Sequence, residues 1–361
     1  MKIVADENIP LIENYFGAHG ALHLKPGRQI TNSDLLDADI LLVRSVTKVN
    51  QALLKNTHVK FVGSVTTGFD HLDIDWLDQA GIKWCVTPGS NAVSVVEYVV
   101  CVIASLQKMN FLPQQKYRAA VIGAGNIGKQ VIQKLELLGC DVVVCDPFCK
   151  DQVTVPIEEL ADLDFISMHT PLTKTGSFPT YHLIQQTFLQ RQKKDCVLLN
   201  AGRGEVISFE DLKLYGQHLI WCLDVFENEP FIDVEVMESA VISTPHIAGY
   251  SIQSKYRGVE MIYHAAIEQN IISAVSNAEP LYPTTAISFN HSTADWRDVV
   301  LKIFDPAAMS QHMKETLLQD ANLFDRLRKN FTDRYEFGFV EVKDVKLSEK
   351  DRVLLECLGL K

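Results

Sequence analysis

The sequence predicts an α/β protein with two doubly wound parallel-sheet domains and a small α+β domain at its C-terminal end. Short apolar runs alternate with helical patterns over residues 1–90 and again over residues 117–245. A glycine-rich turn connects one apolar run to a helical pattern at residues 123–128. Strands that alternate with helices in this way are typical of parallel sheets covered by helices on both faces.

The composition is that of a globular protein with a sizeable core. The chain has 361 residues, 47% of them hydrophobic, and a formal net charge of −11. The negative charge argues against nucleic acid and anionic membranes as main partners. No apolar run approaches the ~20 residues of a membrane span, and the N-terminal residues lack a signal-peptide core. The eight cysteines form no C-x-x-C pair. We therefore expect reduced thiols, no metal site and a cytoplasmic location.

The first domain is predicted from five strands. They are Lys2–Ala5, Ala21–Leu24, Ile40–Arg44, Val59–Val65 and Ile82–Val86, with helical patterns such as Asn32–Asp37 and Asp73–Ala80 between them. This order predicts a flavodoxin-like parallel sheet. Arg44, Ser45 and Thr66 follow two of the strands. Because ligands bind outside the carboxyl ends of parallel strands, these residues are candidate substrate contacts. A surface ion pair is the alternative for Arg44.

The second domain is organised around a dinucleotide-binding pattern. The buried helix predicted at Asn91–Gln107 leads to a strand at Ala119–Ile122, which three glycines follow at the spacing G-x-G-x-x-G: Gly123, Gly125 and Gly128. Such glycines allow a tight turn, close approach of a pyrophosphate and close packing of helix on strand. The helix that starts with Asn126 and Ile127 offers its free N–H groups to phosphates. This spacing predicts a Rossmann domain.

Asp146 indicates which dinucleotide binds. It ends the next predicted strand, Val142–Cys145, and lies 21 residues after Gly125. A carboxylate there accepts hydrogen bonds from a ribose 2′-hydroxyl and repels a 2′-phosphate, which favours NAD over NADP. A glycine-rich turn that binds nothing is the alternative.

The remaining strands of this domain also end in polar residues. After a short helix at Ile157–Leu160, strands are expected at Phe165–His169, Val197–Asn200, Ile220–Val225 and Val241–Ser243, which makes six in parallel. The long amphipathic helix Ser251–Ile272 then returns to the first domain.

Residues 284–361 form an extension. Pro280 and Pro283 mark its boundary, and helices are expected at Met309–Leu318, Leu323–Phe331 and Ser348–Leu358, with a strand at Glu336–Val345. About 80 residues make a marginal independent core, so we expect a domain that packs on a second copy of the chain. Packing on its own subunit is the alternative. The predicted domains are 1–92 with 257–280 for substrate, 93–256 for NAD and 281–361 for dimerisation.

Four motifs in order resemble the NAD-dependent D-2-hydroxyacid dehydrogenases. They are GAGNIG with the later HTP, NAGRG at residues 200–204, LDVFENEP at 223–230 and TPHIAGYS at 244–251. The PHIAGY form, the compact first domain and the extension most resemble the members that oxidise 4-phospho-D-erythronate at C2. Those members act in bacterial pyridoxal phosphate synthesis.

The resemblance implies roles for individual residues. Arg203 holds the substrate carboxylate, His246 takes the C2 hydroxyl proton, and Glu229, the acid directly before Pro230, orients His246. Thr170, Asp224 and Gly249 match positions that contact the cofactor. Tyr250, Ser45 and Thr66 match positions that contact the substrate. His169, beside the motif threonine, is expected to be structural.

The substrate implied is a phosphorylated 2-hydroxy acid, whose phosphate needs cationic groups. Arg44 and Arg257 are the candidates, because Arg257 lies two turns into the return helix. Two alternatives remain open. One is a dehydrogenase of the same class with another substrate, such as 3-phosphoglycerate. The other is an NAD-sensing interaction protein without catalysis.

Overall fold

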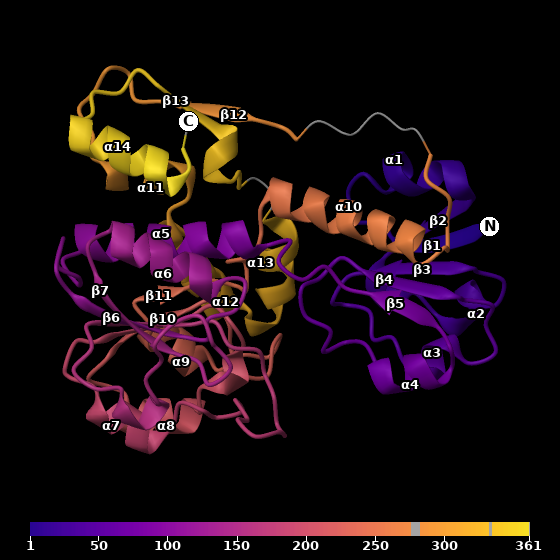
Figure 1. Ribbon diagram of the computed structural model, residues 1–361, viewed down its shortest axis with the longest axis horizontal. Helices are drawn as coiled ribbons and strands as arrows, with labels where there is room; N and C mark the ends of the chain where they lie inside the picture. Colours follow the sequence, from indigo (N-terminus) through magenta and orange to yellow (C-terminus); the bar gives the residue numbers. More distant parts are fainter. Residues whose placement is uncertain (276–281, 332–333, 361) are drawn as a thin grey trace. The chain divides into compact units, whose positions relative to one another are not determined.

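The computed structural model describes residues 1–275, 282–331 and 334–360. It divides into two compact units, residues 1–91 with 251–283 and residues 92–250 with 284–361 (Figure 1). The chain thus leaves the first unit at Asn91 and returns to it at Ser251. The predicted boundary at Pro280 lies outside the described residues.

The first unit contains a five-stranded sheet in which all neighbouring strands pair in parallel. The order is β2-β1-β3-β4-β5. The strands are β1 (Lys2–Asp6), β2 (Ala21–Lys25), β3 (Ile40–Val43), β4 (Phe61–Ser64) and β5 (Lys83–Cys85). This is the flavodoxin-like order, in which the first strand lies between the second and the third. The five predicted strands and their parallel arrangement are confirmed.

Helices cover both faces of this sheet. On one face, α1 (Ile12–Phe16) and α10 (Ile252–Glu268) share an apolar cluster with the strands, to which Phe16 and Ile262 contribute. On the other, α2 (Asn32–Leu35), α3 (Gln51–Leu54) and α4 (Ile74–Gln79) each bury one leucine. Helix α10 is therefore an integral layer of the first unit, although it follows the second unit in sequence.

The second unit contains a six-stranded parallel sheet in the order β11-β10-β9-β8-β6-β7. The strands are β6 (Arg118–Ile122), β7 (Asp141–Cys145), β8 (Phe165–Met168), β9 (Val197–Asn200), β10 (Ile220–Leu223) and β11 (Ile242–Ser243). The chain moves outward from β6 to β7 and then crosses back to β8. The strand order therefore reverses between β6 and β8, the position where ligands bind in open parallel sheets.

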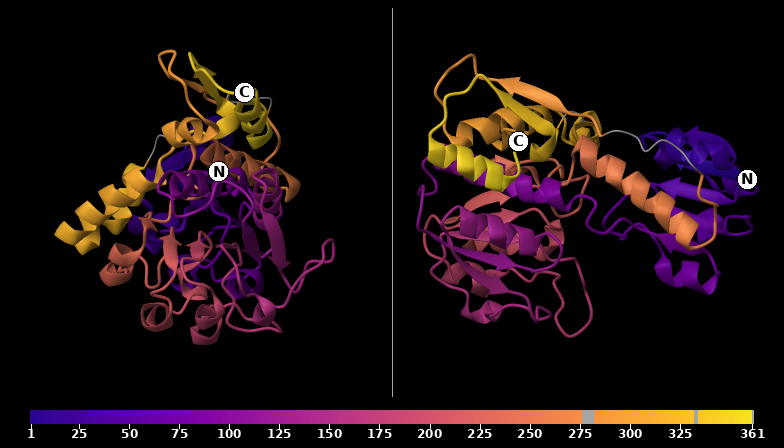
Figure 2. Two further views of the ribbon diagram at one scale, coloured as in Figure 1. Left: turned by 90° about the vertical axis from the view of Figure 1, so that its left-hand side faces the viewer. Right: turned by 45° about the horizontal axis from the view of Figure 1, so that its top comes forward.

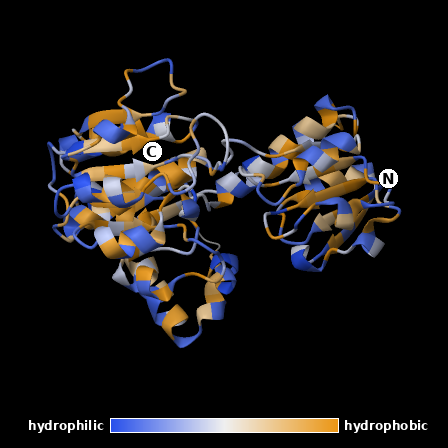
Figure 3. Cartoon of the chain, turned by 90° about the horizontal axis from the view of Figure 1, so that it is seen from below, coloured by the Kyte–Doolittle hydropathy of each residue, from blue (hydrophilic) through white to orange (hydrophobic). Residues whose placement is uncertain are grey.

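The helices of the second unit also lie in two layers. One face is covered by α5 (Ala92–Lys108) and α6 (Gly128–Leu137), the other by α7 (Gln186–Arg191), α8 (Phe209–Tyr215) and α9 (Val234–Ser239). The strands of each sheet carry mainly hydrophobic colours in Figure 3, and the connecting loops are mostly hydrophilic. The carboxyl ends of the strands are thus polar positions at the edge of an apolar core.

The extension differs in detail from the prediction. It contains β12 (Thr285–Ser288), α11 (Trp296–Ile303), α12 (Pro306–Gln319), α13 (Phe324–Asn330), β13 (Val340–Lys343) and α14 (Glu349–Leu358). Strand β12 pairs in parallel with β13. Neither β12 nor α11 was expected from the sequence. The strand predicted at Glu336–Val345 is shorter, because a 3-10 turn occupies Phe337–Phe339.

The extension packs against the Rossmann sheet and its helices (Figure 2). Trp296, Val300 and Phe337 are buried in the same apolar cluster as α5 and α6. Helix α12 covers the edge strand β11, where Ser310 Oγ accepts a hydrogen bond from Ser243 N at 2.8 Å. An edge strand covered in this way offers no free ladder for unwanted pairing. The predicted role of the extension in dimerisation stays a prediction.

Within the described parts of the chain, we find no helix that is long and apolar enough to span a lipid bilayer.

Candidate active site

The glycine turn after β6 has the geometry of a dinucleotide loop. Gly123 has φ of +93°, a region that disfavours side chains, and its N–H donates to Cys145 O at 2.9 Å. A Cβ on Gly128 would lie 1.8 Å from Gly123 O, so only glycine lets α6 start this close to β6. The turn therefore brings the first N–H groups of α6 to the point where the strand order reverses.

Open space and an unpaired hydroxyl at this turn fit a bound dinucleotide. A Cβ built on Gly125 meets nothing within 4 Å, which leaves the backbone open to a pyrophosphate. Gly125 and Asn126 are exposed, and Ile127 precedes α6 as its N-cap. Thr170 Oγ1 is buried and has no hydrogen-bond partner among the described residues. Thr170 lies beside Gly123, because a Cβ there would come within 3.0 Å of Thr170 Cγ2.

Asp146 is oriented by the same turn. One carboxylate oxygen, Oδ2, accepts a hydrogen bond from Ala124 N at 2.7 Å, and Oδ1 accepts one from Phe148 N at 2.8 Å. The acid is therefore held at the tip of β7, against the glycine loop, where a ribose hydroxyl would approach.

His246 and Glu229 form a hydrogen-bonded pair. The distance from His246 Nδ1 to Glu229 Oε2 is 2.7 Å, and Glu229 Oε1 accepts a further hydrogen bond from Phe226 N at 2.9 Å. Burial alone would raise the pKa of Glu229. The charge of His246 and its hydrogen bond outweigh burial and hold that pKa below its ordinary value. An ionised Glu229 at Nδ1 leaves Nε2 of His246 as the basic nitrogen, which can accept a proton.

The side chain of Asp224 holds the turn that carries His246. The carboxylate of this buried residue accepts hydrogen bonds from Ile247 N at 2.8 Å, Ala248 N at 2.9 Å and Thr244 Oγ1 at 2.7 Å. Burial raises the pKa of Asp224 above its ordinary value. Its carboxylate thus holds the turn of His246 together, a task that the sequence did not suggest. Direct contact with the cofactor stays a prediction.

Arg203 follows β9 in a turn shaped by Asn200. The Asn200 side chain accepts a hydrogen bond from Gly202 N at 3.0 Å and donates one to Arg203 O at 2.9 Å. Arg203 Nη1 donates to Gly202 O at 3.0 Å. Strands β9, β10 and β11 are neighbours in the sheet, so the residues that follow them, Arg203, Glu229 and His246, all belong to its carboxyl edge.

Comparison with known proteins identifies the family. Residues 104–248 match the model of the family described as "D-isomer specific 2-hydroxyacid dehydrogenase, NAD binding domain". A Coxiella burnetii protein named erythronate-4-phosphate dehydrogenase (strain RSA 331 / Henzerling II) is 44% identical, with 95% of each chain covered. A protein of the same name from Cellvibrio japonicus is 38% identical over the full length of both chains. This chain belongs to the erythronate-4-phosphate dehydrogenase family.

Solved structures share the fold of this family member. D-lactate dehydrogenase from Aquifex aeolicus, complexed with NAD and lactic acid, is 23% identical with a TM-score of 0.63 and covers 75% of this chain and 96% of its own. The NAD-bound 3-phosphoglycerate dehydrogenase of Entamoeba histolytica is 22% identical, with a TM-score of 0.64. The match covers 78% of this chain and 99% of that protein. The matched NAD-binding domain and the loop geometry together identify NAD as the cofactor.

The substrate residues predicted in the first unit follow β3 and β4. Thr66 Oγ1 lies 2.7 Å from Ser64 Oγ and donates to Gly68 O at 2.8 Å. Arg44 Nε donates to Oδ2 of the fully buried Asp6 at 3.0 Å. The ion pair weighed for Arg44 is therefore present, with a buried acid as its partner. Ser45 directly follows Arg44, and Arg257 Nε donates to Ser90 O at 2.9 Å.

Two arginines of the extension contact the turn that carries His246, and sequence reasoning missed both. Arg334 is buried and donates from Nη1 to Ala248 O at 3.1 Å and from Nη2 to Ser94 O at 2.5 Å. Arg328 Nη2 donates to Tyr250 Oη at 3.4 Å. No local pattern marks either residue, because their partners lie about 80 residues away or more in the sequence. Gly249 and Tyr250 therefore belong to a turn that the extension helps to hold.

Two histidines near the site have other tasks. His169 lies 2.8 Å from Ser167 Oγ through Nε2, and burial lowers its pKa to about 3, so it is neutral. His182 Nε2 pairs with Glu227 Oε1 at 2.7 Å. Glu227 thus has its own partner, in keeping with the choice of Glu229 as the acid that orients His246.

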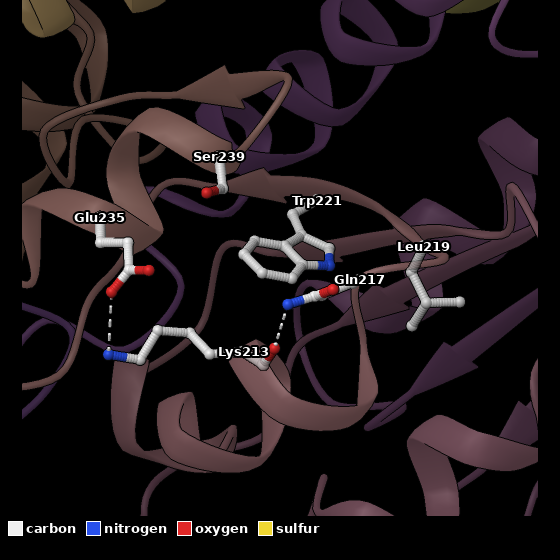
Figure 4. Close-up of a pocket in the computed structure, with 6 residues that line it drawn as sticks. All are labelled: Lys213, Gln217, Leu219, Trp221, Glu235 and Ser239. Carbon is white, nitrogen blue, oxygen red and sulfur yellow. Dashed lines mark hydrogen bonds and ion pairs between the residues drawn. The ribbon is translucent and has the colours of Figure 1, made fainter.

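A shallow pocket of about 220 Å³ lies elsewhere in the second unit (Figure 4). It is lined by Lys213, Gln217, Leu219, Trp221, Glu235 and Ser239. Leu219 and Trp221 lie at the start of β10, whereas Arg203, Glu229 and His246 follow the ends of strands. The pocket is therefore separate from the candidate active site. Among the described residues, no group of three or more His, Cys, Asp or Glu side chains could hold a metal ion.

Proposed function

We propose that this chain oxidises 4-phospho-D-erythronate at C2 to (R)-3-hydroxy-2-oxo-4-phosphooxybutanoate. The observation that carries the proposal is the 2.7 Å pair of His246 and Glu229, in a chain 44% identical to a protein named erythronate-4-phosphate dehydrogenase. NAD supplies the hydride acceptor when bound. From the resemblance we also propose that the reaction belongs to pyridoxal phosphate synthesis and that the chain forms a cytoplasmic homodimer.

In the proposed reaction, Arg203, His246 and Glu229 have separate roles that follow from their charges. The guanidinium of Arg203 binds the substrate carboxylate and polarises the oxygen on C2, a contact that suits its planar fork. Nε2 of His246 accepts the hydroxyl proton as the C2 hydrogen leaves as hydride. Glu229 stabilises the imidazolium that forms, because its carboxylate is already hydrogen bonded to Nδ1. Ser45, Thr66 and Tyr250 are the proposed further contacts of the substrate.

A substrate panel tests the proposal. The purified chain is assayed for NADH formation with 4-phospho-D-erythronate, D-erythronate and 3-phospho-D-glycerate, and the product is identified by mass spectrometry. The proposal expects the first to be oxidised with the highest kcat/KM. A higher value for 3-phospho-D-glycerate would reassign the substrate within the class. No NADH from any 2-hydroxy acid would favour the non-catalytic NAD-sensing alternative.

A further inference from the structure

The extension places a second arginine beside the catalytic residues. Helix α13 is anchored by Phe324, whose ring meets that of Phe226 at 6.2 Å with an interplanar angle of 86°. Phe226 lies in the segment that carries Asp224 and Glu229 and donates its N–H to Glu229. Residues four apart project from the same side of a helix, so Arg328 lies on the same side of α13 as Phe324.

Arg328 is an enclosed cation with few hydrogen-bond partners. Its side chain is 16% exposed, and its Nε is buried with no partner among the described residues. Nη2 makes the long hydrogen bond to Tyr250, over whose ring the guanidinium lies at 5.9 Å. Oδ1 of Asp325 lies 3.9 Å from Nη1 of Arg328, beyond hydrogen-bond distance.

Glu229 does not use the donors of Arg328. Both oxygens of Glu229 are already hydrogen bonded, Oε2 to His246 and Oε1 to Phe226 N. Among the described residues no hydrogen bond joins Arg328 to Glu229, so Arg328 acts on Glu229 through its charge, which helps to lower the pKa of Glu229. Within residues 1–275, 282–331 and 334–360, the hydrogen bond to Tyr250 uses one N–H of Nη2, so Nη1 and the second N–H of Nη2 can donate to a ligand. The planar guanidinium can bind a phosphate through two hydrogen bonds.

We propose that Arg328 binds the phosphate group of the substrate, next to Tyr250, and thereby sets the preference for phosphorylated 2-hydroxy acids. This proposal rests on the proposed function, in which Arg203 takes the carboxylate at the other end of the substrate. It gives the extension a part in substrate recognition. Under this proposal Arg328, rather than Arg44 or Arg257, makes the main contact with the phosphate. The Nε atoms of Arg44 and Arg257 are hydrogen bonded to Asp6 and Ser90.

The test compares two substrates in three variants. We measure kcat/KM for 4-phospho-D-erythronate and D-erythronate with the wild type, Arg328→Gln, Arg328→Lys and the control Arg326→Gln. Arg326 is exposed on the same helix. Losing a charge-assisted hydrogen bond typically costs about tenfold or more in affinity. Arg328→Gln should therefore lower kcat/KM for the phosphorylated substrate at least about tenfold, mainly through KM, while D-erythronate changes less than about threefold.

The variants Arg328→Lys and Arg326→Gln test whether the preference depends on the charge at position 328. Arg328→Lys keeps the charge and should retain part of the preference, and Arg326→Gln should keep all of it. An equal loss for both substrates in Arg328→Gln would overturn the proposal, because it would show that Arg328 acts through Glu229 or through the fold. Thermal unfolding and NADH fluorescence verify that each variant is folded. If Arg328→Gln fails these checks, an unchanged substrate ratio in folded Arg328→Lys overturns the proposal.

Failure of the proposed function gives a different result. If the wild type prefers 3-phospho-D-glycerate, the assigned substrate is wrong, and the same ratio is measured for 3-phospho-D-glycerate against D-glycerate. A selective loss for the phosphorylated member of that pair in Arg328→Gln would still support the phosphate contact. A wild type that prefers neither phosphorylated substrate would overturn it.

Discussion

The backbone and the side chain of His246 are each held by a hydrogen bond to a neighbouring acidic residue. Its φ of +55° turns the chain sharply, and its N–H donates to Asp224 O at 2.7 Å. A left-handed backbone at a non-glycine residue costs free energy and persists only where the surroundings hold it. Here Asp224 holds the turn from below, and Glu229 fixes the imidazole through Nδ1. The imidazole is thus held by Glu229 through Nδ1, which suits the proton transfer that we propose for Nε2.

Replacing His246 by Gln should remove most turnover and leave NADH binding intact. The imidazole acts on the substrate hydroxyl, and general acid–base groups typically contribute ~10²–10⁴-fold to the rate. Stopped-flow measurement of the chemical step, with NADH fluorescence for binding, checks this expectation. The control His264→Gln changes a histidine of α10 whose side chain is 60% exposed and should behave as wild type. A His246→Gln variant that keeps half of the wild-type rate would refute the assigned role.

Replacing Asp146 by Ala should narrow the preference for NAD over NADP. Ala124 N and Phe148 N hold the wild-type carboxylate. We expect it to repel a 2′-phosphate and to accept hydrogen bonds from the ribose hydroxyls. The ratio of kcat/KM for the two cofactors measures the effect. Asp141→Ala, which removes an exposed acid at the start of β7, is the matched control. Equal use of NADP by the wild type would show that Asp146 does not select the cofactor.

At the scale of elements, the sequence pattern predicted the two sheets and four elements of the extension (α12, α13, β13 and α14), but neither β12 nor α11. Each sheet strand is a short apolar run between helical patterns, so its existence and the parallel order follow from the sequence. Strand β12 pairs with β13 across more than 50 residues, and no local pattern records such a partner. Helix α11 spans only eight residues and is stabilised by packing on α5. Arg328 and Arg334 were missed for the same reason.

Two glycines of the loop should respond differently to Ala. Gly128→Ala puts a Cβ 1.8 Å from Gly123 O, so the loop must shift. We expect it to lower the free energy of unfolding by about 1–3 kcal/mol, as overpacking does, and to weaken NADH binding. Gly125→Ala meets no protein atom and should preserve thermal stability, while it raises the Kd for NADH about tenfold or more. Unchanged NADH affinity in Gly125→Ala would place the pyrophosphate elsewhere.

At the scale of the whole molecule, the extension completes the second unit of its own chain. It contributes Trp296 and Phe337 to the core, covers β11, and holds the turn of His246 through Arg334. It also leaves apolar side chains outside, since Leu318 on α12 is 56% exposed and Val353 on α14 is 49% exposed. A small domain with one buried face and further apolar surface can serve two packing roles at once.

We therefore expect a homodimer in which residues 284–361 bury apolar surface against the second copy. Light scattering at micromolar concentration should give a mass near twice the 40.5 kDa of one chain. Leu318→Glu and Val353→Glu place a charge on the exposed apolar positions and test which helix forms the contact, because a buried unpaired charge is costly. A wild-type chain that runs as a monomer at this concentration would contradict the expected dimer.

The most direct test of the account uses 4-phospho-D-erythronate that carries deuterium at C2. If His246 takes the hydroxyl proton while the C2 hydrogen leaves as hydride, the deuterium must appear in the reduced cofactor. Mass spectrometry of the NADH formed by the wild type should show one deuterium per molecule of 2-oxo acid produced. Unlabelled NADH, or no turnover of this substrate, would contradict oxidation at C2 by the Arg203, Glu229 and His246 site.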